Sequence, residues 1–156
     1  MELPGLYLVQ MEKHGSIQSL SLQDVAARLK DFGILPTTQR LLIARVLFSR
    51  DQHLSADQVM QYVNDDKDRV SKATVYNTLG LFASKGLVRE VIVDPTRVFY
   101  DPNTSNHHHF YNVDTGELRD IEATELTIES LPELPEGTVC EGVDVIIRLS
   151  NATETH

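Results

Sequence analysis

Residues 71–100 read SKATVYNTLGLFASKGLVREVIVDPTRVFY and predict one helix followed by two strands. Ser71 is a typical helix N-cap, and the lysine-glycine pair at 85–86 ends the helix. Between them, apolar residues recur at the spacing of one helix face: Val75, Leu79 and Phe82. An Asp-Pro-Thr turn then joins two strands, which we expect at residues 87–93 and 97–100.

Helices are also predicted upstream of this stretch. Ser21 and Ser55 are expected to cap two of them, and Pro36-Thr37 opens another. Each carries apolar residues at helical spacing, so helices are expected at residues 22–32, 37–49 and 56–63. Helices followed by a two-stranded hairpin are typical of a winged helix-turn-helix. We therefore expect a winged-helix DNA-binding domain at residues 21–101, preceded by an arm at residues 1–20 that shows no clear period.

Beyond residue 101 the pattern changes to short strands. A hairpin is expected at residues 110–121, and alternating apolar residues predict a further strand at 143–149. The stretch between them is expected to be partly helical and broken by two prolines. Because residues 107–150 are too few for a comfortable core, we expect a homodimer. The predicted fold class is α+β, an N-terminal winged helix-turn-helix followed by a small α/β domain for dimerisation and ligand sensing.

The charge of the chain is divided unevenly. Residues 1–100 hold 12 Lys/Arg and 11 Asp/Glu, a net charge of +1, whereas residues 101–156 hold 2 and 12, a net charge of -10. Phosphates repel an acidic surface, so contacts to double-stranded DNA are expected from the N-terminal part alone. The asymmetry indicates two tasks in two regions.

Composition excludes several classes of protein. No stretch reaches the roughly 18 apolar residues of a membrane span, and no secretion signal is evident at the N-terminus. Cys140 is the single cysteine, which rules out an internal disulfide framework. We therefore expect a soluble cytoplasmic protein with no membrane partner.

The helix at residues 72–84 is expected to enter the major groove of DNA. Asn77 offers a donor and an acceptor to adenine, and Tyr76 can pack on a thymine methyl group, although Tyr76 could instead be partly core. Basic residues near helix N-termini can contact DNA phosphates, and a basic residue in the hairpin can enter a minor groove. Six residues are predicted to contact DNA: Arg40, Lys72, Thr74, Tyr76, Asn77 and Arg97.

Three consecutive histidines, His107, His108 and His109, follow the predicted winged helix. Side chains two apart on a strand face the same way, so His107 and His109 are expected to converge while His108 points to the other face. Imidazoles with a carboxylate suit zinc, iron, manganese or copper, and Asp101 and His53 are candidate further ligands. The alternative is a solvated surface patch, but the run lies at a domain junction.

Several motifs resemble the ferric uptake regulator (Fur) family over about residues 22–122. They are GILPTTQR at 33–40, HLSAD at 53–57, VSKATVYNTL at 70–79 and KGLV at 85–88. The sequence HHHFYN at 107–112, followed by TGEL, is similar to the iron response regulators (Irr) of alpha-proteobacteria within that family. The resemblance implies a dimeric winged-helix regulator of iron and haem genes.

The resemblance also implies a metal site at the domain junction. Its ligands carry over as His53, Asp101, His107 and His109, with Asp101 standing where many members have Glu. The family's structural zinc site does not carry over, because Asn112 and Thr115 replace one cysteine pair and Cys140 is alone.

Two effectors remain open. In the leading hypothesis the regulator is active in low iron and is released from DNA by haem, bound through His107, His108 and His109. In the alternative, a divalent ion (Fe, Mn or Zn) binds the junction site and promotes binding to an A/T-rich palindromic operator. An enzyme is not expected, because no paired general acid and base accompany the histidines. For either ligand, affinity is expected to fall between about pH 7 and 5.5 as imidazoles protonate.

Overall fold

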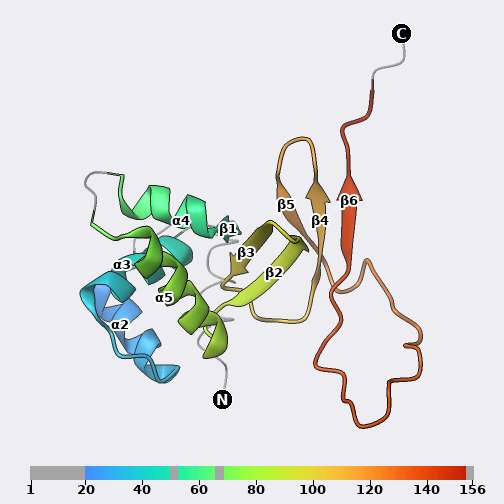
Figure 1. The fold of residues 1–156 in the computed structure, drawn as a ribbon, viewed down its shortest axis with the longest axis horizontal. Helices are drawn as coiled ribbons and strands as arrows, with labels where there is room; N and C mark the ends of the chain where they lie inside the picture. The colour runs from blue at the N-terminus through green and yellow to red at the C-terminus, as the bar shows by residue number, and fades with distance from the viewer. Residues whose placement is uncertain (1–19, 50–52, 66–68, 154–156) are drawn as a thin grey trace. The chain divides into compact units, whose positions relative to one another are not determined.

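The computed structural model describes residues 20–49, 53–65 and 69–153, and the chain divides into two compact units (Figure 1). Unit 1 comprises residues 1–105 and unit 2 residues 106–156. Most of the predicted N-terminal arm therefore lies outside the described residues. Among the described residues, unit 1 holds the helices and one small sheet, and unit 2 holds a second small sheet. The predicted α+β class is confirmed.

The helices of unit 1 begin where the sequence predicts. They are α2 (Leu22–Asp31), α3 (Thr38–Phe48), α4 (Ala56–Val63) and α5 (Lys72–Ser84). In each, the side-chain oxygen of the N-cap residue accepts a backbone N–H from the first turn, which otherwise has no partner within the helix. The four N-caps are Ser21, Thr37, Ser55 and Ser71.

A tight turn ends α5 and leads into the two-stranded hairpin that forms the wing. Gly86 has φ +80°, which favours glycine, and Leu87 N–H returns to the Phe82 carbonyl at 2.9 Å. Strand β2 (Arg89–Asp94) then pairs with β3 (Arg97–Asp101), two residues later than the predicted start. The turn at Gly86 explains why β2 begins later than predicted, because Leu87 and Val88 are buried directly after the turn and before the strand.

A two-residue strand, β1 (Leu54–Ser55), completes the first sheet in the order β1-β3-β2. It is too short to produce the alternation that reveals strands in a sequence. Leu54 pairs with Tyr100 in antiparallel register. This register brings His53, which directly precedes β1, to the end of β3.

Unit 1 has an extensive apolar core. The face of α5 that carries Val75, Leu79 and Phe82 is fully buried, as predicted, against residues of α2 and α3 such as Leu29 and Ile43. Fully burying one such side chain stabilises the fold by about 1.5–3 kcal/mol. The packing therefore fixes which face of α5 remains in solvent.

Unit 2 contains β4 (His108–Asn112), β5 (Leu118–Ile121) and β6 (Ile146–Leu149), in the order β5-β4-β6. The hairpin β4-β5 is antiparallel and β6 joins β4 in parallel. The expected partial helix between β5 and β6 is wrong, because residues 122–145 contain no helix. Pro132 and Pro135 lack the N–H that a helix needs, and nearly all side chains of the segment are exposed, so no apolar face supports helix formation.

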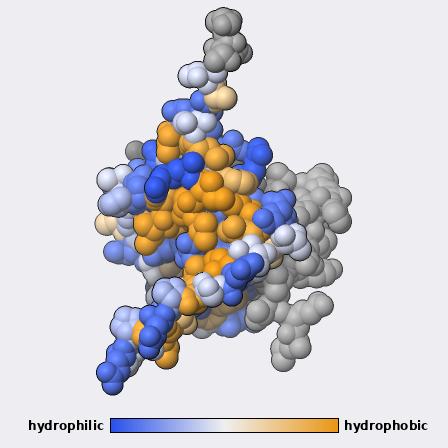
Figure 2. Space-filling model, turned by 90° about the vertical axis from the view of Figure 1, so that its right-hand side faces the viewer, coloured by the Kyte–Doolittle hydropathy of each residue, from blue (hydrophilic) through white to orange (hydrophobic). Residues whose placement is uncertain are grey.

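The apolar surface of unit 2 is large for its size. Tyr111 and Ile121 are its fully buried apolar side chains in the described part of the chain. Figure 2 shows apolar side chains gathered on one face. The large exposed apolar residues in the described part of unit 2 are Val113, Ile128, Leu131, Leu134, Val139 and Leu149. Such a surface is typical of an interaction site. Separately, none of the described helices has the length and apolar character needed to cross a bilayer.

Candidate metal centre and nucleic-acid interface

Unit 1 holds one imidazole next to one carboxylate. His53 precedes β1 and Asp101 ends β3, so the pairing of these two strands brings them together. His53 Nε2 lies 2.9 Å from Asp101 Oδ2, and both side chains are nearly buried. Asp101 Oδ1 also accepts the backbone N–H of Asn103 at 2.9 Å. One oxygen of Asp101 therefore faces the imidazole while the other organises the chain that follows.

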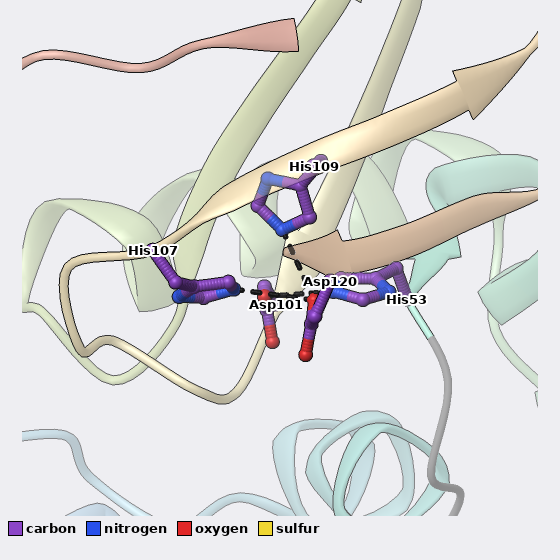
Figure 3. A group of neighbouring side chains, drawn as sticks. All are labelled: His53, Asp101, His107, His109 and Asp120. Atoms are coloured by element: carbon purple, nitrogen blue, oxygen red, sulfur yellow. Dashed lines mark ion pairs between the residues drawn. The ribbon is translucent and has the colours of Figure 1, made fainter. Parts of the chain in front are cut away.

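Unit 2 holds two imidazoles that face one carboxylate (Figure 3). His107 Nε2 and His109 Nε2 each lie 3.3 Å from Asp120 Oδ1. The strand register sets this geometry, because His109 of β4 pairs with Asp120 of β5. The two histidines are almost fully buried, whereas the Asp120 side chain is 35% exposed. The predicted convergence of His107 and His109 is confirmed.

Sequence reasoning missed Asp120. A hairpin was predicted at residues 110–121, but its register, which pairs His109 with Asp120, was not. Candidate ligand atoms of His107, His109 and Asp120 lie within 4.8 Å of one another. These three side chains are thus a ready donor set within unit 2.

The distances suit a bound ion. Ligands bonded at about 2.1 Å lie roughly 3.0 Å apart on an octahedron and roughly 3.4 Å apart on a tetrahedron. The contacts at Asp101 and at Asp120, 2.9 and 3.3 Å, fall at these edges. Imidazole nitrogens with carboxylate oxygens form a borderline donor set that zinc, iron and manganese accept. Both groups of side chains therefore fit a divalent transition metal.

His108 has a different task. Its Nδ1 accepts the backbone N–H of Val145 at 3.0 Å, just before β6. This bond leaves the proton of a neutral ring on Nε2. His108 thus faces away from the other two histidines, and the three imidazoles do not form one cluster.

The exposed face of α5 carries most of the residues predicted to contact DNA. Lys72, Tyr76 and Asn77 are exposed, and Tyr76 at 43% is therefore not a core residue. Thr74 is half-buried and its hydroxyl accepts from Ser71 Oγ at 2.9 Å. The structure leaves these side chains available to a ligand.

The Tyr76 hydroxyl donates to Asp57 Oδ1 of α4 at 3.2 Å. Burial first, and then this hydrogen bond and the charge of Asp57, raise the pKa of Tyr76. The Lys72 ammonium lies 5.7 Å from the centroid of the Tyr76 ring. Sequence reasoning missed Asp57, which no pattern in the sequence connects to α5.

The two predicted arginines lie elsewhere in unit 1. Arg40 is in the first turn of α3 and donates to the Leu35 carbonyl at 3.0 Å, which holds it beside the helix N-terminus. Arg97 begins β3 and is exposed. The wing turn before Arg97 is fixed by Asp94, whose Oδ1 accepts the Thr96 N–H and hydroxyl at 2.8 and 2.7 Å. Those bonds lower the pKa of Asp94, the hydroxyl contributing most.

Comparison with known sequences gives a consistent result. The model of the ferric uptake regulator family matches residues 31–137. The peroxide-responsive repressor PerR of Staphylococcus aureus (strain Mu50) is 34% identical over 113 residues, which cover 72% of this chain and 76% of PerR. Similarity to this relative extends over most of both chains.

Solved structures share the fold. The ferric uptake regulator of Pseudomonas aeruginosa with manganese has a TM-score of 0.61 at 24% identity, covering 81% of this chain and 97% of that one. The Vibrio cholerae ferric uptake regulator gives 0.64 at 22%, covering 81% and 98%. A zinc-bound manganese uptake regulator gives 0.60 at 20%, covering 85% and 100%. At these identities the likeness establishes the fold.

Proposed function

The chain belongs to the ferric uptake regulator family, and from this we propose that it is a transcription regulator whose binding to DNA is controlled by a divalent metal. Members of this family regulate transcription and are not enzymes. The observation that carries the proposal is the pair of buried imidazoles, His107 and His109, held at 3.3 Å from one carboxylate of Asp120. Two buried imidazole nitrogens beside one carboxylate oxygen are a donor set that a divalent ion accepts.

We assign the metal ligands to His53, Asp101, His107 and His109, with Asp120 added as a further carboxylate. Residues 102–106 alone separate the last donor of unit 1 from the first donor of unit 2 along the chain. An ion that takes donors from both units would tie them together and so restrict the placement of α5 on DNA. Related proteins of this fold hold manganese, iron or zinc, which supports the same class of ion here.

A metal fits the donors better than haem does. His107 and His109 are almost fully buried and face a carboxylate, and His108 Nδ1 already accepts from Val145. Haem needs a largely apolar slot beside its axial ligand, whereas His107 and His109 face the Asp120 carboxylate. Nothing in the described residues supports a haem site, and haem control through His107, His108 and His109 stays a prediction, as does closeness to the Irr branch.

In this function unit 1 reads the operator and unit 2 forms a homodimer. Lys72 and Arg40 contact phosphates, Tyr76 and Asn77 contact bases, Thr74 supports the start of the helix and Arg97 enters a minor groove. Two copies related by a two-fold axis match a palindromic operator, which we expect to be A/T-rich. The metal acts as co-repressor, in keeping with the repressor PerR among its relatives.

Operator binding by metal-depleted protein tests the proposal. DNA selected from a random pool is titrated by fluorescence anisotropy without metal, with Mn²⁺, Fe²⁺ or Zn²⁺, and with haem. We expect one or more divalent ions to strengthen binding at least tenfold. The matched variants are His109→Ala, which should abolish that gain, and His108→Ala, which should retain it. Loss of DNA binding on addition of haem, with no effect of metals, would overturn the proposal.

A further inference from the structure

The acidic residue Asp57 lies on the side of unit 1 that should approach DNA. It accepts the hydroxyl proton of Tyr76 at 3.2 Å, across the contact between α4 and α5. The hydrogen bond joins residues 19 positions apart and is exposed. A carboxylate beside a base-reading side chain is unfavourable toward phosphates. Its presence there calls for a reason beyond the stability of α4.

Asp57 lies in a well-capped first turn of α4. Ser55 and Gln58 form a capping box, with Ser55 N donating to Gln58 Oε1 at 2.9 Å and Gln58 N to Ser55 Oγ at 3.3 Å. Asp57 lies between them in the first turn, where the helix N-terminus favours negative charge. The capping box therefore fixes the backbone that carries Asp57, and the helix N-terminus stabilises its charge.

We propose that Asp57 is a positioning residue for base recognition, which fixes the Tyr76 ring so that the ring packs on thymine methyl groups. This inference rests on the proposed DNA-binding function. Because the Tyr76 hydroxyl donates its hydrogen bond to Asp57, it has no second proton to donate to base acceptors or phosphate oxygens. The ring is left to make apolar contact, for which the major groove offers the thymine 5-methyl group.

Lys72 reinforces this arrangement. Its ammonium lies 5.7 Å from the ring centroid, within the range of a cation–π contact. Asp57 thus holds the Tyr76 hydroxyl, and Lys72 contacts the face of the same ring. Removing Asp57 should free the Tyr76 ring to rotate and its hydroxyl to donate to any nearby acceptor on DNA. We therefore expect the preference for thymine to decrease more than the overall affinity for DNA.

Operators in which single thymines are replaced by uracil measure the contact directly, because uracil lacks the methyl group. For the metal-loaded wild type, anisotropy titrations should show about a fourfold loss of affinity at the contacted position. Asp57→Ala should reduce this loss to less than about 1.5-fold. Asp57→Asn, whose amide oxygen still accepts a hydrogen bond from the hydroxyl, should restore the fourfold loss.

Asp24→Ala is the matched control, because Asp24 also lies in the first turn of a helix, α2, and accepts from Ser21. It should leave the uracil effect unchanged, which separates positioning from general helix stability. A fourfold uracil effect that persists in Asp57→Ala but vanishes in Tyr76→Ala would overturn the role of Asp57. Failure of the wild type to bind any selected operator would instead overturn the proposed function.

Discussion

His107, His108 and His109 are neighbours in the chain but serve two sides of strand β4. His107 and His109 face Asp120 at 3.3 Å, and His108 accepts the Val145 N–H at 3.0 Å. The two-residue period of a strand makes this division unavoidable. Identical side chains in one run therefore have different expected roles, metal binding for two of them and attachment of the chain before β6 for the third.

Replacing single histidines should separate these roles. His109→Ala removes a buried imidazole donor, and we expect the affinity for Mn²⁺ to fall by at least about 100-fold, more than the loss typical of an outer partner of a ligand. His108→Ala should change it by less than about threefold. Isothermal titration of metal-depleted protein measures both. Equal losses in the two variants would contradict the assignment.

Metal binding should depend on pH with a definite sign. An imidazole binds metal only when it is neutral, so protons compete with the ion as the pH falls. We expect the Mn²⁺ affinity to decrease as the pH is lowered from about 7 to 5.5. Titrations at several pH values measure this decrease. A flat profile would mean that the histidines are not ligands.

The site was predictable in part from its residues. The strand period alone brought His107 and His109 together, since that depends on local geometry. Asp120 and Asp57 were missed, because each meets its partner through strand register or helix packing, which connect distant parts of the chain. Local patterns predict local geometry, whereas partners from another element need the fold.

At the scale of elements, the starts of helices were the most predictable feature. Ser21, Ser55 and Ser71 cap the helices as expected, because the capping hydrogen bond spans only three residues, and Thr37 caps the helix that it was expected to open. The stretch at residues 122–145 was expected to be partly helical and is not. Helices of that length depend on packing of an apolar face, and the segment is largely exposed.

The wing turn offers a test of its own. The Thr96 hydroxyl is the largest cause of the lowered pKa of Asp94, so the folded wing favours the ionised carboxylate. This contribution to stability is present above the unfolded pKa of about 3.9 and is lost as pH falls through the folded value. Thr96→Val should move the Asp94 pKa upward, as measured by NMR titration. An unchanged pKa would show that the hydroxyl does not hold the turn.

At the scale of the whole molecule, the net charge is divided unevenly between the two parts of the chain. Residues 1–100 carry a net charge of +1 and residues 101–156 carry -10. The acidic part also bears the exposed apolar side chains of unit 2, such as Val113 and Leu149. Acidic surface repels DNA and apolar surface favours association, so unit 2 is suited to meet another protein copy rather than the operator.

A charge on that apolar surface should therefore disrupt the dimer. Leu149 is 39% exposed on β6, and Leu149→Glu should shift the protein toward monomer in sedimentation velocity. Ile92→Glu is the control, because Ile92 is 62% exposed in unit 1 on β2. The control should leave the oligomeric state unchanged. A dimer that persists in Leu149→Glu would place the interface elsewhere.

The most direct test of metal control measures the coupling from both sides. If Mn²⁺ strengthens operator binding by some factor, operator must strengthen Mn²⁺ binding by the same factor, because linkage is reciprocal. Isothermal titration of Mn²⁺ into metal-depleted protein, with and without saturating operator, gives the second factor. We predict that the operator raises the Mn²⁺ affinity at least tenfold, matching the gain in DNA affinity. Equal Mn²⁺ affinities in both titrations would contradict control of DNA binding by this metal.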